Sequence, residues 1–559
     1  MSATLGLYYR TIRHLTLRQI VYQVWNRLRG RPRLRWQETV PPDVPTPTFP
    51  LTFTFLNQSV TFEQAIDWNY AALGKLWTYN LNYFEWLTSP PGPLSLKKGE
   101  VGALWPCGIL PKSLANSDES WSAPPSPFFK ERGPGGEVRL GLALIYDFIR
   151  QTPTLKDGLE PYPISLRVVN WRRFLRANNL HDPLIERHLY AQTALLRSRL
   201  EYHLGANHLL ENACALAIMA VHFRHEAWFR KAASLLRAEL DEQILRDGGH
   251  YERSPVYHQL LTDRLLDVYE TLRADPWTPD AALTAFVAEK LGLMLGWLQA
   301  VTFRNGDVPL VNDAALGVAP STAELLAKAG ALHLAPTPVR LGESGYRMLT
   351  TERLECFIDV GPVGPDHQPG HAHADTFSFI LYADQKPTIL DVGTSTYQPG
   401  PQRTYERSTA AHNTVSVTGQ NSSEVWGGFR VGRRAGVTII HDEATFLSAS
   451  HNGFLSSLNT YHTRSWHIID ATTIEINDII SKNELTNQYH IFFDSSLYLT
   501  SEHSSIFADG LRLTYSSPER TSVSINQQPV AAGFNQVRSA PHLTIRFTNT
   551  LTTLLTATP

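Results

Sequence analysis

The spacing of hydrophobic residues along the chain changes near residue 335. From about residue 140 to residue 330, apolar residues recur with the 3.6-residue period of an amphipathic helix. The clearest helical stretches are 184–200, 209–222 and 260–272. From about residue 345 onward, short alternating or β-branched runs are separated by turn residues, which is typical of antiparallel strands. The clearest of these runs are 377–382, 413–417, 436–440, 472–476 and 542–547.

These patterns predict a multidomain α+β protein with a helical part at residues 37–335 and an antiparallel β part at residues 336–559. Within the helical part, a stretch rich in Pro, Gly and Ser at about 89–137 predicts an extended or mobile insertion. Residues 1–36 contain eight arginines and no acidic residue, and their apolar residues predict a basic helical segment. We expect this segment either to dock on the body of the protein or to lie on an anionic membrane surface.

Composition narrows the class of protein. The 559 residues exceed the size at which one hydrophobic core stops growing, and 43% hydrophobic against 18% charged residues is typical of a folded chain. Because 50 basic and 52 acidic side chains nearly cancel, no nucleic-acid partner is expected. The three cysteines have no CxxC spacing, which argues against a disulfide framework or a cysteine zinc site.

Targeting signals are not evident in the sequence. The apolar runs at 212–223 and 291–303 are shorter than the ~18 residues of a membrane span. At the N-terminus the arginines follow the apolar residues, which is the reverse of a secretory signal. We therefore expect a soluble cytoplasmic protein, with peripheral attachment to the inner membrane through the basic segment as an option.

One group of polar side chains lies on a predicted helix that begins at the Asn-His-Leu-Leu-Glu-Asn segment, residues 207–212. The helical period puts Glu211 on the same face as Asn207 and His208. Side chains of these types can hold a carboxylate or sugar hydroxyls. A helix cap with hydrogen-bonded buried polar groups is the alternative interpretation.

A tyrosine is predicted in the first turn of another helix. Ser254 and Pro255 fit the N-cap and first positions of that helix, which places Tyr257 close behind them. The partial positive charge at the helix N-terminus, with Arg253 if it folds back, is expected to lower the pKa of Tyr257 toward a range useful for proton transfer. A buried structural tyrosine is the alternative interpretation.

The segment Gly-His-Ala-His-Ala-Asp at residues 370–375 is the strongest local signal for a metal. On an extended chain, the period of two puts His371, His373 and Asp375 on one face. Downstream, Asp391 and His412 add the oxygen and nitrogen ligands that zinc accepts. The competing explanation is that 21 histidines in one chain produce some His-x-His pairs by chance.

Arginines and aromatic residues alternate in two Gly-containing loops, 400–407 and 421–430. The first loop contains Arg403, Tyr405 and Arg407. Such a surface can grip an anionic sugar polymer through charge-assisted hydrogen bonds and stacking. A domain interface would use the same residue types.

Taken together, these motifs resemble the heparinase II/III family of polysaccharide lyases. The matching segments are 79–84, 162–167 with 170–171, 207–212, 248–258, 312–314, and the block from 369–375 to 411–417. The resemblance implies an (α/α) toroid, an incomplete helical barrel, followed by an antiparallel β-sandwich. It also implies β-elimination on an anionic, glycosaminoglycan-like polysaccharide that contains uronic acid.

The resemblance assigns roles to the motif residues. Asn207 or His208 would neutralise the uronate carboxylate, Tyr257 would act as base and acid, and His371 would be the second proton-transfer group. One structural zinc ion would be held by three residues: His373, Asp391 and His412. The expected substrate-binding residues are Glu211, Arg253, Arg403, Tyr405 and Arg407.

Two other functions use the same features. A uronyl C5-epimerase forms the same carbanion and returns the proton to the other face, and the residues do not separate it from a lyase. A non-catalytic polysaccharide-binding or assembly protein needs only the arginine and aromatic loops. The basic N-terminus, the 89–137 insertion and the lack of a signal peptide depart from the family pattern. The missing signal and the basic segment suggest a role in making a cell-surface polysaccharide. The sequence predicts no particular oligomeric state.

Overall fold

The computed structural model describes residues 2–87, 134–277, 280–482 and 484–558. Its chain divides into two compact units that interleave along the sequence. The first unit is formed by Met1–Leu17, Glu239–Leu266 and Thr284–Pro559, and the second by Arg18–Ala238 and Asp267–Leu283. The predicted insertion at 89–137 lies outside the described residues, except for its last residues, which begin a helix at Pro134.

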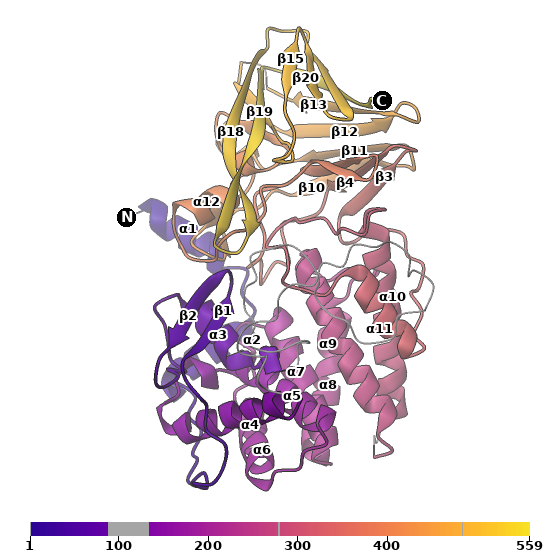
Figure 1. Ribbon diagram of the computed structural model, residues 1–559. Helices are drawn as coiled ribbons and strands as arrows, with labels where there is room; N and C mark the ends of the chain where they lie inside the picture. The colour runs from indigo at the N-terminus through magenta and orange to yellow at the C-terminus, as the bar shows by residue number, and fades with distance from the viewer. Residues whose placement is uncertain (1, 88–133, 278–279, 483, 559) are drawn as a thin grey trace. The chain divides into compact units, whose positions relative to one another are not determined.

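The second unit is mainly helical (Figure 1). Its helices are α2 (Leu17–Arg29), α3 (Lys75–Tyr83), α4 (Pro134–Gln151), α5 (Pro161–Ala177), α6 (Pro183–Ser198), α7 (Ala206–His222), most of α8 (Glu226–Gln243) and the end of α9 (Pro255–Ala274). A hairpin of β1 (Leu51–Phe55) and β2 (Gln58–Phe62) precedes α3. Local signals set the helix starts, as at α6, where the Asp182 side chain accepts hydrogen bonds from the amides of Leu184 and Ile185.

The first unit holds the other helices and nearly all of the strands. Its helices are α1 (Ser2–Ile12), the start of α9, α10 (Ala281–Val301), α11 (Thr322–Ala331), α12 (Pro401–Glu406) and α13 (Leu455–Leu458). By length and composition α10 could cross a membrane, although half of its apolar window is buried inside the protein. It also packs closely on its own unit, since the Thr337 amide donates to the Gly292 carbonyl at 2.8 Å. These features are typical of a core helix.

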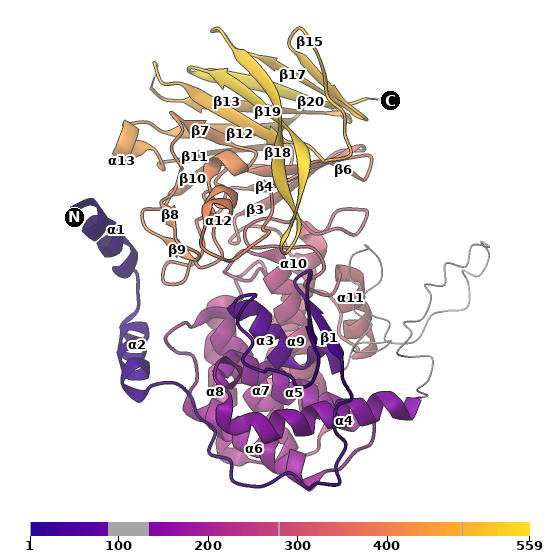
Figure 2. The ribbon, with the colours of Figure 1, turned by 60° about the vertical axis from the view of Figure 1, so that its left-hand side comes forward.

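Antiparallel strands of the first unit form three main sheets (Figures 1 and 2). The largest sheet has the order β10 (Val437–Asp442), β11 (Phe446–His451), β12 (His462–Ile468), β13 (Thr473–Ile480), β20 (Thr550–Ala557), β17 (Leu511–Ser516), β16 (Ser505–Ala508), β15 (Thr500–Glu502). A second sheet has the order β18 (Ser522–Gly533), β19 (Gln536–Phe547), β14 (Asn487–Phe492), β7 (Val415–Val417). The third has the order β3 (Tyr346–Thr350), β4 (Leu354–Asp359), β5 (Phe379–Ala383), β6 (Lys386–Ile389), and β8 (Val425–Trp426) pairs with β9 (Arg430–Val431).

One hydrophobic core joins these sheets. Side chains such as Trp466, Ile476, Tyr489 and Leu543 come from different strands and are completely buried in the same cluster. Along β20 buried and partly exposed residues alternate, as expected for a strand with one face on a core. The prediction of a helical part followed by an antiparallel β part is therefore confirmed.

The basic N-terminal segment forms two helices rather than one. In the first unit, α1 docks through Arg10, whose guanidinium forms two hydrogen bonds of 2.8 Å with the Glu424 carboxylate. The ring of Tyr8 meets the edge of Trp426 at a centroid distance of 5.1 Å. The second helix, α2, belongs to the other unit.

Candidate functional site

Tyr257 lies in the first turn of α9, as predicted, because the helix begins at Pro255 behind Ser254. The Ser254 hydroxyl donates to the Asp313 carbonyl at 3.0 Å and fixes this helix start against a neighbouring loop. The Tyr257 hydroxyl is 3.0 Å from the hydroxyl of Tyr397. Its ring lies against the His371 imidazole, with a centroid distance of 4.0 Å. The two predicted proton-transfer groups of this unit are thus direct neighbours.

The predicted fall in the pKa of Tyr257 is wrong. Burial raises its pKa above the usual value, and the nearby carboxylates of Asp313 and Glu252 act in the same direction. The hydrogen bond to Tyr397 and the charge of Arg403 lower the pKa but do not compensate. Tyr257 is therefore a neutral phenol, which suits a proton donor better than a resting base.

A buried aspartate, Asp313, organises the groups around Tyr257. One of its carboxylate oxygens lies 2.9 Å from His371 Nδ1 and the other lies 3.0 Å from His373 Nε2. Both oxygens also accept hydrogen bonds from the Arg403 guanidinium. Burial alone would raise the pKa of Asp313, but the charge of Arg403 and these hydrogen bonds hold it well below the usual range.

The charge of Asp313 fixes the protons of both histidines. An ionised carboxylate can only accept hydrogen bonds, so His371 Nδ1 and His373 Nε2 must both be donors. In a neutral imidazole the lone pair then lies on the other nitrogen, which is Nε2 in His371 and Nδ1 in His373. His371 is therefore oriented as a proton acceptor at Nε2.

The segment that carries these histidines is a loop before β5 and not the extended chain that its alternation suggested. Asn312, at a positive φ of 57°, holds the loop because its side-chain oxygen accepts the His373 amide at 3.0 Å. The same side chain donates to the Arg253 carbonyl at 3.0 Å. The loop is thus shaped by contacts with distant segments rather than by a sheet ladder.

Arg403 and Arg407 do not form the expected exposed surface for a polymer. Both side chains are fully buried. Arg403 pairs with Asp313 and also donates to the Gly428 carbonyl at 3.0 Å. Arg407 donates to the carbonyls of Ala372 at 2.9 Å and Arg430 at 3.2 Å. Their contacts hold loops of one unit together, which is neither the expected polymer-binding surface nor the alternative of a domain interface.

Arg253 and Tyr405 are also turned inward. The Arg253 guanidinium donates to the carbonyl of Ser344 at 2.9 Å and to that of Tyr251 at 3.2 Å, rather than folding back over Tyr257. The Tyr405 hydroxyl is buried with no hydrogen-bond partner among the described residues, and burial raises its pKa. Direct substrate binding by these two residues stays a prediction.

The predicted zinc ligands lie near one another, but the described residues contain no group of three or more His, Cys, Asp or Glu side chains arranged to hold an ion. His412 Nδ1 is 2.7 Å from an oxygen of Asp391, which orients this ring. The rings of His373 and His412 are 5.4 Å apart. Within the described structure, His373 Nδ1, His412 Nε2 and one oxygen of Asp375 are buried without a hydrogen-bond partner.

Charge around His412 favours a cation. Burial raises the pKa of Asp375 to about 6, and the charge of Asp391 contributes to this rise. The pKa of Asp359 is raised well above its usual value by burial and by the charge of Asp375. Burial opposes protonation of His412, but these three carboxylates raise its pKa. Two nitrogen donors beside buried, mutually repelling carboxylates fit a divalent cation such as zinc.

The other predicted residues belong to the second unit. There α7 begins at Ala206, and Asn207 and Glu211 are buried on it. The His208 ring packs against Tyr162 at a centroid distance of 4.4 Å, and its Nδ1 is 3.2 Å from the Glu201 carboxylate. The geometry of this cluster does not choose between Asn207 and His208, so that choice stays open as predicted.

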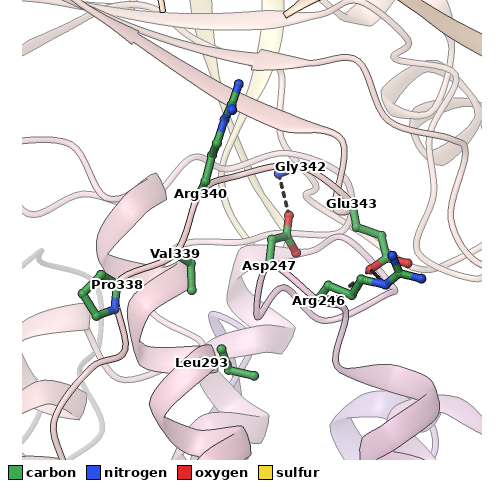
Figure 3. Close-up of a pocket in the computed structure, with 8 residues that line it drawn as sticks. All are labelled: Arg246, Asp247, Leu293, Pro338, Val339, Arg340, Gly342 and Glu343. Atoms are coloured by element: carbon green, nitrogen blue, oxygen red, sulfur yellow. Dashed lines mark hydrogen bonds and ion pairs between the residues drawn. The ribbon is translucent and has the colours of Figure 1, made fainter.

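A separate pocket of about 600 Å³ occurs elsewhere in the first unit (Figure 3). Its lining includes Arg246, Asp247 and Arg340, none of which was predicted as a site residue. The Asp247 carboxylate is already paired within the protein, because it accepts hydrogen bonds from the amides of Gly342 and Ser344 at 2.9 Å. This pocket is a structural junction between loops.

Sequence reasoning missed three residues beside Tyr257 and His371. Asp313 was part of a matching segment, yet nothing in its neighbours along the chain indicated its partners. Tyr397 gave no local signal. Phe429, which is 45% exposed, stands 5.3 Å from the Tyr397 ring and lies in the loop predicted to contain aromatic groups.

Comparisons with known proteins agree with this fold. A model described as heparinase II/III N-terminus matches residues 163–330, and one described as heparinase II/III-like, C-terminal matches residues 335–554. A search of curated protein sequences found no match. A solved heparinase III gene product is 16% identical, with 76% of each chain covered and a TM-score of 0.58. The heparan sulfate lyase HepC from Pedobacter heparinus is 16% identical, with 75% of this chain and 72% of its own covered and a TM-score of 0.52.

Structures this distant in sequence show a shared fold, and the two family models together span more than half of the chain. The family resemblance of the motifs is thereby confirmed. The chain belongs to the heparinase II/III-like family and is a polysaccharide lyase.

Proposed function

We propose that this lyase cleaves an anionic polysaccharide that contains uronic acid by β-elimination, with His371 and Tyr257 as its proton-transfer groups. The observation that carries the proposal is the contact between the two rings, together with the Asp313 carboxylate that orients His371. The similar solved structures are named as a heparinase III and a heparan sulfate lyase. Those names support an anionic polysaccharide as the class of substrate.

The two side chains suit different halves of the reaction. His371 Nε2 carries the lone pair and takes the proton from C5 of the uronate. The C5–H electron pair forms a C4=C5 double bond, the C4–O4 bond breaks, and the departing oxygen takes the proton of the neutral Tyr257 hydroxyl. Return of the proton from His371 to Tyr257 through solvent restores the enzyme. Neutralisation of the uronate carboxylate by Asn207 or His208 stays a prediction; one such donor is worth ~3 kcal/mol.

A pair of matched variants tests the role of Tyr257. Tyr257→Phe and Tyr397→Phe each remove one hydroxyl of the same 3.0 Å hydrogen bond. Each is expected to cost about 1 kcal/mol in free energy of unfolding. Only Tyr257→Phe is expected to lower kcat by ~10²–10⁴-fold, the range typical of general acid–base groups, while Tyr397→Phe stays within about tenfold of the unchanged protein.

The assay follows the ultraviolet absorbance of the unsaturated product and the chain length on a panel of uronic-acid polysaccharides. Equal, small losses of activity in the two variants would remove Tyr257 from the mechanism. Deuterium incorporation at C5 from heavy water without chain cleavage would indicate an epimerase instead. Binding without any turnover on the panel would indicate a binding or assembly protein.

We also propose one structural zinc ion held by His373, Asp391 and His412. The proposal is supported by the buried His373 Nδ1, which has no hydrogen-bond partner among the described residues, by the 2.7 Å contact of His412 Nδ1 with Asp391, and by the concentration of carboxylates around His412. Asp375 competes with Asp391 for the oxygen position, because one of its oxygens is also buried without a partner among the described residues. When bound, the ion would neutralise these carboxylates and join the loops that carry the histidines.

A cytoplasmic location and a role in making a cell-surface polysaccharide stay predictions. Both are independent of the proton-transfer chemistry. Fractionation of cells that produce the protein is the direct measurement of its location.

A further inference from the structure

Helix α2 uses its polar side to dock on the second unit. Gln19 donates to the Leu204 carbonyl at 3.4 Å, and Asn26 lies 3.1 Å from the His203 ring nitrogen. The Tyr22 ring packs at 4.6 Å from the neighbouring Tyr202. Gln19 is the fully buried residue of this helix. The face of α2 against the protein therefore consists of amides and a tyrosine, and two arginines lie at its margins: Arg29 donates to the Ser198 carbonyl at 2.9 Å and Arg18 lies over the Tyr202 ring.

The opposite side of α2 is apolar and exposed. Six large hydrophobic side chains have between 40% and 76% of their surface exposed. They are Leu17, Ile20, Val21, Val24, Trp25 and Leu28. With 100° per residue they occupy one stripe about 140° wide. A surface helix of a globular protein normally buries such a stripe, so α2 presents the side that other helices hide.

Basic residues border this stripe. On the helical wheel Arg27 follows one edge, and Arg18 and Arg29 follow the other. Three further arginines come directly after the helix, at residues 31, 33 and 35, and their side chains are exposed. No acidic residue precedes Glu38, so nothing within the first 37 residues offsets this charge.

We propose that the exposed apolar face of α2 inserts into the interface of an anionic lipid bilayer. An apolar stripe between arginines, with a tryptophan near its edge, matches the acyl chains below and the phosphates above in such an interface. Each arginine near an anionic surface contributes about a fivefold increase in partitioning. A protein groove would have to be both apolar and strongly acidic to match the same pattern, so the lipid surface is the better fit. The polar docking face of α2 keeps the rest of the chain attached to the inserted helix.

Flotation of the full chain with lipid vesicles tests the proposal. We expect binding to phosphatidylcholine vesicles that contain phosphatidylglycerol, weaker binding to phosphatidylcholine alone, and release by high salt. Arg27→Gln should weaken binding to the anionic vesicles about fivefold and leave binding to the neutral vesicles unchanged.

A matched pair of variants separates this face from general stickiness. Leu28→Glu places an acid in the stripe and should reduce vesicle binding by at least about tenfold. Ile440→Glu makes the same kind of change at an exposed residue of β10 and should reduce it little. Both side chains are exposed, so thermal unfolding should change little in either variant.

Three outcomes overturn the proposal. The first is no binding to anionic vesicles, and the second is an equal loss of binding in Leu28→Glu and Ile440→Glu. The third is self-association in sedimentation velocity that Leu28→Glu abolishes while vesicles stay unbound, which would assign the face to a second copy of the chain.

Discussion

Asp313→Asn removes a negative charge at the centre of the candidate site while keeping the size of the side chain. In the native protein Asp313 and Arg403 are both completely buried and paired. The same carboxylate accepts from His371 and His373. An asparagine keeps one acceptor oxygen and turns an NH₂ group toward these donors, so at least one donor loses its partner and Arg403 keeps an unpaired buried charge.

The expected cost in stability follows from that pairing. Breaking a buried ion pair by removing one partner costs about 3–5 kcal/mol in free energy of unfolding. Activity should fall further than stability explains, because the His371 proton is no longer held on Nδ1 by a carboxylate. We expect kcat to fall by ~10²–10⁴-fold, because this is the range that a general base contributes and His371 would no longer be oriented to act as one.

A second buried cluster in the same unit provides the control. Asp478 accepts from Arg464 at 2.7 Å and from His462 at 2.6 Å, and all three side chains are fully buried. Asp478→Asn should therefore cost a similar amount of stability. The cluster of Asp478, Arg464 and His462 contains no residue of the candidate site, so kcat per folded molecule should stay near that of the native protein.

Urea unfolding and kcat, measured on both variants and corrected for the folded fraction, decide between the explanations. If Asp313→Asn keeps a kcat similar to that of Asp478→Asn, Asp313 is only a structural ion-pair partner. In that case His371 does not depend on it.

Two further predictions concern the metal and the N-terminal helix. The purified protein should contain about one equivalent of zinc. Chelation should lower the free energy of unfolding, and the decrease should be larger in the native protein than in Asp391→Asn. A zinc content below about a tenth of an equivalent, together with full stability in chelator, would contradict this prediction. The pKa of Glu424 is lowered, because the hydrogen bonds and charges of Arg10 and Arg433 outweigh the effect of burial. Its pairing with Arg10 therefore stabilises α1 docking above about pH 4.3 and is lost as the pH falls through the lower folded pKa. Hydrogen exchange of α1, corrected for intrinsic rates, should rise in that range, and Glu424→Gln should abolish the transition.

Local sequence was sufficient for the parts of the site that depend on neighbours along the chain. Ser254 and Pro255 predicted where α9 begins, and thus the place of Tyr257 in its first turn. The electrostatics of Tyr257 were not predictable in this way. The helix terminus is visible in the sequence, whereas burial, which raises the pKa, depends on residues brought in by the tertiary fold.

Long separations explain the residues that the sequence did not reveal. Asp313 meets His371 across 58 residues and Arg403 across 90, so no local pattern connects them. The loop at 370–375 alternates like a strand, yet Asn312 and Asp313 take up its polar groups and no sheet ladder forms there. Arg403 and Arg407 have the composition of a surface loop, and only the structure shows that both are buried.

The docking of α1 has a consequence for how the protein is made. Arg10 leaves the ribosome early, but its partner Glu424 follows 414 residues later. At a synthesis rate of ~5–20 residues per second, α1 waits about 20–80 s for the surface that receives it. Throughout that time the helix exposes its apolar side chains on a nascent chain. Arg10 and the seven arginines that follow it in the basic segment, with no acidic residue before Glu38, keep such segments apart by mutual repulsion until the surface around Glu424 has emerged.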